Sequence, residues 1–131
     1  MSTARQEVSV PGLSSAISHY ADAVRFGDLL FISGLTPHDH EGNLIGGDDV
    51  VAQTRKVLEN IDSVLKHVGA GFKDILKVTI YLTDVSDRTR INPVRQEFFG
   101  SSKPASTLVE VSALALPGMK IEIEAVVGLP K

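Results

Sequence analysis

The sequence contains no cysteine and no tryptophan, and only 5% of its 131 residues are aromatic. The absence of cysteine excludes a disulfide scaffold, a zinc site with thiolate ligands and a cysteine nucleophile. The scarcity of aromatic rings argues against a surface that stacks the bases of single-stranded nucleic acid. No run of apolar residues approaches the ~20 residues that a transmembrane helix needs.

Positive charge is also scarce, since 13 Lys and Arg stand against 16 Asp and Glu, a formal net charge of -3. Surfaces that bind nucleic acid through its phosphates usually carry an excess of positive charge. The first ten residues lack the apolar stretch of a secretory signal. The sequence therefore predicts a cytoplasmic protein with neither a membrane nor a nucleic acid as partner.

The length fits a single domain over residues 1–131, and we find no internal repeat or low-complexity segment. Two β-prone runs surround Gly27-Asp28 within residues 22–33, which is typical of a hairpin. A loop rich in glycine and proline is predicted after it, over residues 34–47.

Two helices are predicted. Residues 49–68 place apolar side chains at a spacing of 3.6 residues, with Asp48 and Asp49 suited to cap the start and Gly69 the end. A second helix is predicted over about residues 89–99. Pro93 leaves two interpretations there, because the helix could begin at Asn92-Pro93 or run through the proline with a distorted first turn.

Three further strands are predicted over residues 75–83, 104–111 and 120–127, where side chains alternate in character. The order strand, strand, helix, strand, helix, strand, strand predicts an α+β fold with two helices on one face of a mixed sheet. Two helices shield only one face. Because the last strand is apolar on both faces at its end, we expect another subunit to cover the second face.

Some polar residues stand out as candidates for chemistry. His38 and His40 could bind a metal, but they lie in the predicted loop without a third ligand, so we interpret them as part of a solvated loop and predict no metal site. Glu122 and Glu124 are two residues apart on a predicted strand and share a face. They could form an acid–base pair or be two solvated glutamates. The other candidates are Tyr20, Ser33, Asn92, Arg95, Ser106 and Glu110.

Several motifs together resemble the Rid family, also known as the YjgF or endoribonuclease L-PSP family. The resemblance runs over residues 18–127. It implies a chorismate-mutase-like fold and a homotrimer whose sheets form an inner β-barrel, with ligand sites in the clefts between subunits. The motifs that carry it are LFISG at 30–34, QTRKVLENI at 53–61, IYLTD at 80–84, Pro104-Ala105 and KIEIEA at 120–125.

The resemblance also implies an activity. Well-known members of the family hydrolyse reactive imines or enamines and release ammonia, with no cofactor. By resemblance, Glu122 is the catalytic residue that orients or activates the water. Tyr20, Ser33, Gly34 and Asn92 are then expected to line the substrate cleft.

The chain departs from the family pattern at one position, where an arginine that holds the substrate carboxylate is replaced by Ser106. Arg95, one turn after Asn92 in the predicted helix, could supply the missing cation. Alternatively, the substrate has no carboxylate there. Two further functional hypotheses stay open: a non-catalytic small-molecule-binding or holdase-like trimer, and a ribonuclease, which the net negative charge disfavours.

Overall fold

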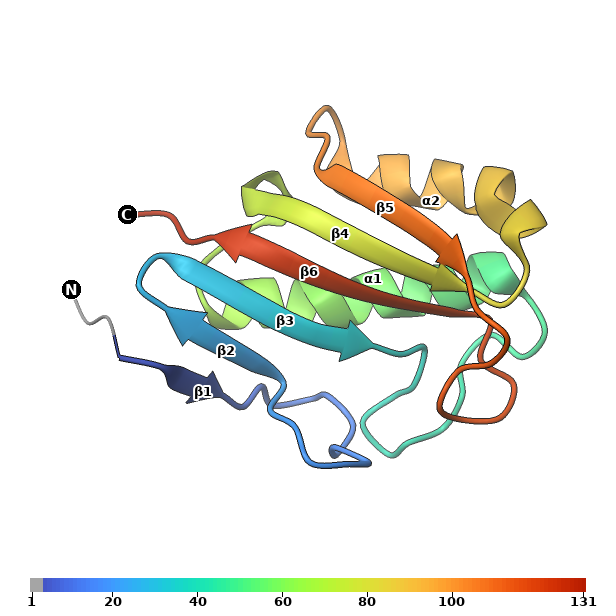
Figure 1. Cartoon of the computed structure of the whole chain (residues 1–131), viewed down its shortest axis with the longest axis horizontal. Helices are drawn as coiled ribbons and strands as arrows, with labels where there is room; N and C mark the ends of the chain where they lie inside the picture. Colours follow the sequence, from blue (N-terminus) through green and yellow to red (C-terminus); the bar gives the residue numbers. More distant parts are fainter. Residues whose placement is uncertain (1–3) are drawn as a thin grey trace.

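The computed structural model describes residues 4–131, which form one six-stranded sheet with two helices against one face (Figure 1). The strand order is β1-β2-β3-β6-β4-β5, and only β4 and β5 are parallel. This confirms the predicted α+β class, although β1 was not predicted. The strands are β1 (Gln6–Val8), β2 (Ala23–Phe26), β3 (Leu29–Leu35), β4 (Ile75–Leu82), β5 (Ala105–Glu110) and β6 (Ile121–Gly128).

Helix α1 (Val50–His67) lies close to its predicted bounds. The side chain of Asp49 accepts a hydrogen bond from the backbone N–H of Val51 at 2.9 Å, which is the N-cap contact that the sequence predicts. Gly69 follows the helix with a φ of +74°, a conformation that glycine adopts without strain. In the part of the chain that the structure describes, no helix is both long and apolar enough to cross a bilayer.

Helix α2 (Arg88–Phe99) contains Pro93 in its interior, so the interpretation that the helix begins at Asn92-Pro93 is wrong. A short 3-10 turn at Val85–Asp87 leads directly into the helix and starts it before the proline. The burial of Ile91 and Val94 against the core holds the helix together on either side of Pro93, whose ring is exposed.

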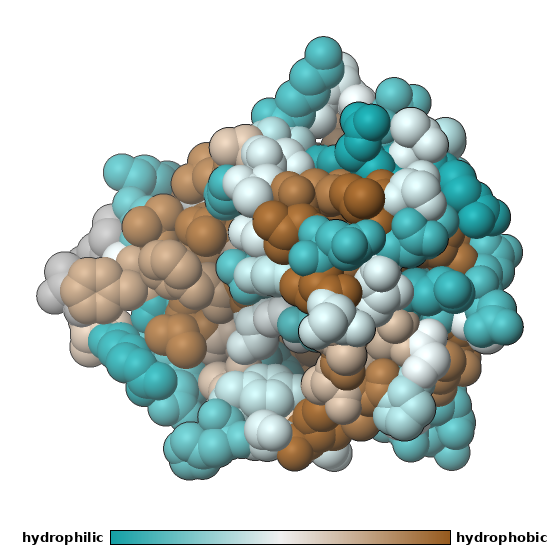
Figure 2. Space-filling view, turned by 45° about the vertical axis from the view of Figure 1, so that its right-hand side comes forward, coloured by the Kyte–Doolittle hydropathy of each residue, from teal (hydrophilic) through white to brown (hydrophobic). Residues whose placement is uncertain are grey.

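The two faces of the sheet differ in what covers them. The face toward α1 and α2 is buried and includes Ile32, Ile80 and Ile123. The opposite face, turned toward the viewer in Figure 1, has no helix over it in the described chain. Phe31 and Leu29 of β3 are 47% and 39% exposed on this open face, and hydrophobic surface gathers on part of it (Figure 2).

Gln53 of α1 is a fully buried polar residue that connects the loop before α1 with the loop between β5 and β6. Its side-chain amide donates to the carbonyls of Gly47 at 2.6 Å and Gly118 at 2.9 Å. Its side-chain carbonyl accepts from the backbone N–H of Lys120 at 2.8 Å. These bonds hold the chain immediately before β6, the strand that carries Glu122.

Gln53→Leu should therefore destabilise the protein, because leucine fits the apolar helix face but leaves three backbone groups without partners. An unsatisfied buried polar group typically costs ~1–3 kcal/mol, so we expect a loss of ~2–5 kcal/mol in the free energy of unfolding. Urea denaturation measures this loss. Gln96→Leu, at an exposed glutamine of α2, is the control, and equal stability of the two variants would contradict the prediction.

Candidate functional site

A cavity of about 280 Å³ brings together four of the predicted site residues, including Glu122. Glu122 lies on β6 and pairs across the sheet with Tyr81 of β4. The cavity lies where the open face of the sheet meets the chain that precedes β2. Its lining residues are Ile17, Ser18, Tyr20, Ser33, Gly34, Thr36, Ala115 and Glu122.

The end of β3 fixes one wall of this cavity. The Ser33 hydroxyl donates to the backbone carbonyl of Ala21 at 2.6 Å, which ties β3 to the segment after Tyr20. Gly34 lies directly against the Glu122 carboxylate, and a β-carbon at this position would overlap Glu122 Oε2. Because glycine has no side chain, position 34 leaves the space that the Glu122 carboxylate occupies.

The pKa of Glu122 is raised from its ordinary value, first by burial of the carboxyl group and then by the negative charge of Glu124. Tyr81 Oη donates to Glu124 at 3.1 Å, and burial together with this carboxylate raises the pKa of Tyr81. The carboxylate of Glu122, in contrast, accepts no hydrogen bond from any group within residues 4–131. The two glutamates share a face, as predicted, but only Glu122 lines the cavity.

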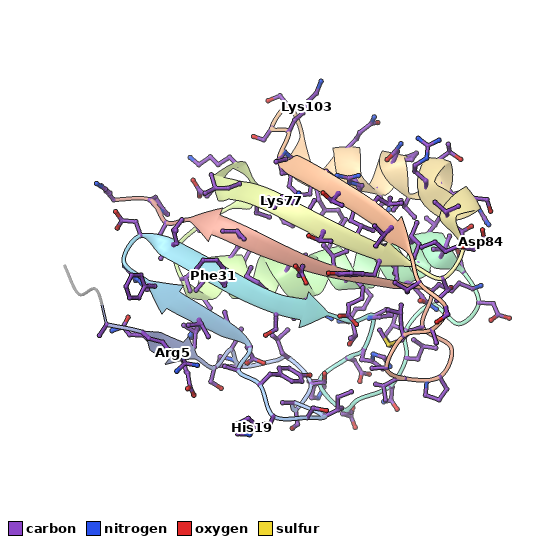
Figure 3. The ribbon with its side chains drawn as sticks, in the orientation of Figure 1. Arg5, His19, Phe31, Lys77, Asp84 and Lys103 are labelled. Carbon is purple, nitrogen blue, oxygen red and sulfur yellow. The ribbon has the colours of Figure 1, made fainter. Side chains whose placement is uncertain are left out.

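A second cavity, of about 330 Å³, lies at the β5 edge of the sheet, between α2 and the start of β5. Asn92 and Arg95 both line it, which confirms that they share a helix face. Arg95 Nη2 donates to Ser106 Oγ at 3.1 Å. The loop before β5 forms the rest of the wall, including Lys103, which is labelled in Figure 3.

The two cavities are separate within one chain. Strand β4 lies between β6 and β5, so Glu122 and Ser106 are on non-adjacent strands. They also project on opposite sides of the sheet, because Ser106 pairs with buried Val78 whereas Glu122 pairs with Tyr81 on the open face. One chain thus presents two groups of predicted site residues without joining them.

The interpretation of the two histidines as a solvated loop is wrong for His38, which is only 5% exposed. Its Nδ1 lies 2.9 Å from Thr36 Oγ1, and Asn60 Nδ2 donates to its backbone carbonyl at 3.0 Å. Burial lowers the pKa of His38. His40 is exposed, as predicted. Across residues 4–131, no three side chains of the metal-binding types cluster together.

Sequence reasoning missed some residues that shape the first cavity. Ala115 lies in the irregular loop between β5 and β6, and no pattern in the sequence marks it. Gln53 could have been found, because it occupies an apolar position of α1 three residues after Val50 and four before Val57.

Glu110, which the sequence suggested as a candidate for chemistry, lines neither cavity. Its carboxylate accepts a hydrogen bond from the backbone N–H of Val85 at 2.9 Å.

Comparison with known proteins places the chain among deaminase relatives. It is 42% identical over 110 residues to a RutC family protein of Pyrococcus abyssi, with 84% of this chain and 86% of the relative covered. It is 35% identical over 126 residues to a 2-iminobutanoate/2-iminopropanoate deaminase of Capra hircus, covering 95% and 90%. It is 34% identical over 122 residues to the 3-aminoacrylate deaminase RutC of Acinetobacter baylyi, covering 92% and 96%.

The fold agrees with solved structures. A Rid family protein of unknown function from Yersinia pestis matches with a TM-score of 0.90 at 35% identity, covering 96% of this chain and all of the other. The sequence model named Endoribonuclease L-PSP matches residues 13–128. The chain therefore belongs to the Rid family, the family described by the Endoribonuclease L-PSP model.

Proposed function

We propose that the protein hydrolyses a small imine or enamine and releases ammonia, and that Glu122 activates the attacking water. The observation that carries this proposal is the setting of the Glu122 carboxylate, which is half-buried in a small cavity and has a raised pKa. A carboxyl group with a raised pKa can exchange a proton near neutral pH more easily than an ordinary glutamate. The names of the relatives from goat and Acinetobacter support the same reaction class.

The reaction that we propose needs one base and one acid, and a single carboxyl group can serve as both. Ionised Glu122 takes a proton from water while the water oxygen forms a bond to the imine carbon. The protonated carboxyl then returns that proton to the nitrogen. This gives a carbinolamine, and Glu122 next carries the proton of its new hydroxyl group to the nitrogen as the carbon–nitrogen bond breaks. Ammonia leaves and a carbonyl group remains, so imine and water give a 2-oxo compound and ammonia.

We propose further that the complete site forms between two copies of the chain in a homotrimer with an inner β-barrel. Two observations support this arrangement. The open face of the sheet exposes apolar side chains such as Phe31, which another copy would cover. The Glu122 cavity lies on the central strands β3 and β6 and the Arg95 cavity at the β5 edge, so a neighbouring copy could bring one of each together.

The trimer makes a direct prediction for the mass of the native protein. We expect three times the chain mass of 14.0 kDa by native mass spectrometry and by light scattering. Phe31→Glu should weaken the assembly, because it places a charge on a surface that becomes buried. A wild-type protein that is monomeric at micromolar concentration would contradict the shared site.

The activity itself is tested by ammonia release from a set of substrates. Purified protein is mixed with freshly generated 2-iminobutanoate, 2-iminopropanoate or 3-aminoacrylate, and ammonia is followed over time. We expect at least one substrate to be hydrolysed faster than in buffer. If the protein accelerates the hydrolysis of none of them, the deaminase proposal is refuted. The result would then favour a non-catalytic small-molecule-binding or holdase-like trimer.

A further inference from the structure

Arg95 differs in its surroundings from the three arginines that form ion pairs. It is half-buried, and no carboxylate lies within ion-pair distance of it among the residues that the structure describes. Its hydrogen-bond partner is the uncharged hydroxyl of Ser106. Three other arginines pair with carboxylates: Arg5 with Glu7, Arg55 with Glu97, and Arg90 with Asp87.

A half-buried cation without a counter-charge is unfavourable, because burial removes water from the guanidinium and nothing negative replaces it. Burial lowers the pKa of Arg95, whereas the neighbouring carboxylate of Glu97 raises the pKa of Arg55. A bound anion would supply the missing negative charge. The setting of Arg95 therefore favours a ligand that carries one.

The cavity beside Arg95 has room and suitable chemistry for such a ligand. It holds about 330 Å³, and its wall contains no aspartate or glutamate. A guanidinium has five N–H donors, and Ser106 engages one of its nitrogens. The Asn92 amide, one helical turn away on the same wall, adds a neutral polar group.

We propose that Arg95 binds the carboxylate of the substrate, with Ser106 as a positioning residue that orients the guanidinium from β5. This inference rests on the proposed function, and it narrows the substrate to imines or enamines that bear a carboxylate. Arg95 reaches its cavity from α2, and its guanidinium donates to the short Ser106 side chain of β5. A planar guanidinium matches a carboxylate with two parallel hydrogen bonds.

Binding of pyruvate and of pyruvamide to the assembled protein tests the proposal without turnover. Pyruvate is a 2-oxo acid of the product class, and pyruvamide has the same shape without the charge. Titrations followed by NMR should show that Arg95→Gln weakens pyruvate ~10- to 100-fold and leaves pyruvamide unchanged. Arg88→Gln makes the same charge change at an exposed position of α2 and should leave both affinities at wild-type values.

A second variant moves the cation. Ser106→Arg in the Arg95→Gln background places a guanidinium on β5 beside the same cavity and should restore a large part of pyruvate binding. Arg95→Lys should restore less, because an ammonium keeps the charge but not the planar pair of donors. Rescue by the relocated arginine separates anion recognition from a structural role of Arg95.

The outcomes separate this inference from the proposed activity. Pyruvate binding that depends on Arg95, in a protein that hydrolyses no imine, would support the carboxylate site and refute the deaminase. Hydrolysis of an imino acid with the same KM in wild type and Arg95→Gln would support the deaminase and refute the carboxylate site at Arg95. Equal loss of pyruvate and pyruvamide, or no pyruvate binding by the wild type, would overturn the role of Arg95.

Discussion

Glu122→Gln should reduce kcat on the best imine substrate by ~10²- to 10⁴-fold, the usual contribution of a general acid–base group. Glutamine keeps the size and the hydrogen-bonding shape of the side chain but cannot accept the proton of the attacking water. Steady-state ammonia release measures the effect. A variant that retains the wild-type kcat would show that another group activates the water.

The same substitution should not weaken the fold. The pKa of folded Glu122 is raised, so the folded protein holds this proton more tightly than the unfolded chain does. The stability from that proton is fully present below the unfolded pKa and is lost as the pH rises through the folded pKa. At neutral pH the group is therefore unfavourable, and Glu122→Gln should unfold at the wild-type denaturant concentration or a higher one.

Glu124→Gln is the matched control, because Glu124 lies on the same strand and the same face as Glu122 but outside the cavity lining. It should keep a wild-type kcat at pH values where Glu122 is ionised. Removal of its negative charge should lower the pKa of Glu122 and move the acidic limb of the kcat profile to lower pH. The move is partial, since burial, the larger cause of the shift, stays in place.

Gly34→Ala should reduce kcat by ~10²-fold while the protein stays folded. The new β-carbon would overlap Glu122 Oε2, which is the end of a flexible side chain, so the carboxylate moves and the strand does not. A displacement of about 1 Å from the productive position is enough for a loss of this size. Ammonia release and thermal unfolding, measured on the same preparation, separate activity from folding.

Gly128→Ala is the control for Gly34→Ala. Gly128 also lies in a strand, and a β-carbon there would meet the carbons of Leu76 at 3.4–3.6 Å, which is ordinary contact. This variant should keep the wild-type rate. If both glycine variants were equally active, the close approach of Gly34 would not position the carboxylate.

Much of the fold follows from local patterns in the sequence. The 3.6-residue spacing and the caps of α1 specify that helix almost to the residue, and the Gly27 turn specifies the β2–β3 hairpin. Strand β1 escapes prediction because three residues are too few for an alternating pattern. The sequence leaves the start of α2 open between residue 89 and Asn92-Pro93, and the tertiary burial of Ile91 outweighs the local preference of Pro93.

The site is less predictable from the sequence than the fold. Its residues are brought together by the pairing of strands, and their spacing along the chain does not reveal this. The chain places Tyr20 and Glu122, a hundred residues apart, on one cavity, and this grouping was expected from the resemblance alone. The hydrogen bond from Arg95 to Ser106 depends on how α2 crosses the edge of β5. The burial of His38 likewise depends on Asn60, which α1 directs at the loop.

Competition for 2-iminobutanoate shows whether the protein hydrolyses an imine. An amino-acid oxidase generates the imine in the presence of semicarbazide, which traps it as a semicarbazone. We expect wild-type protein to slow semicarbazone formation in proportion to its concentration and heat-denatured protein to leave it unchanged. Semicarbazone formation that is unaffected by any concentration of the folded wild-type protein would show that the protein does not hydrolyse this imine.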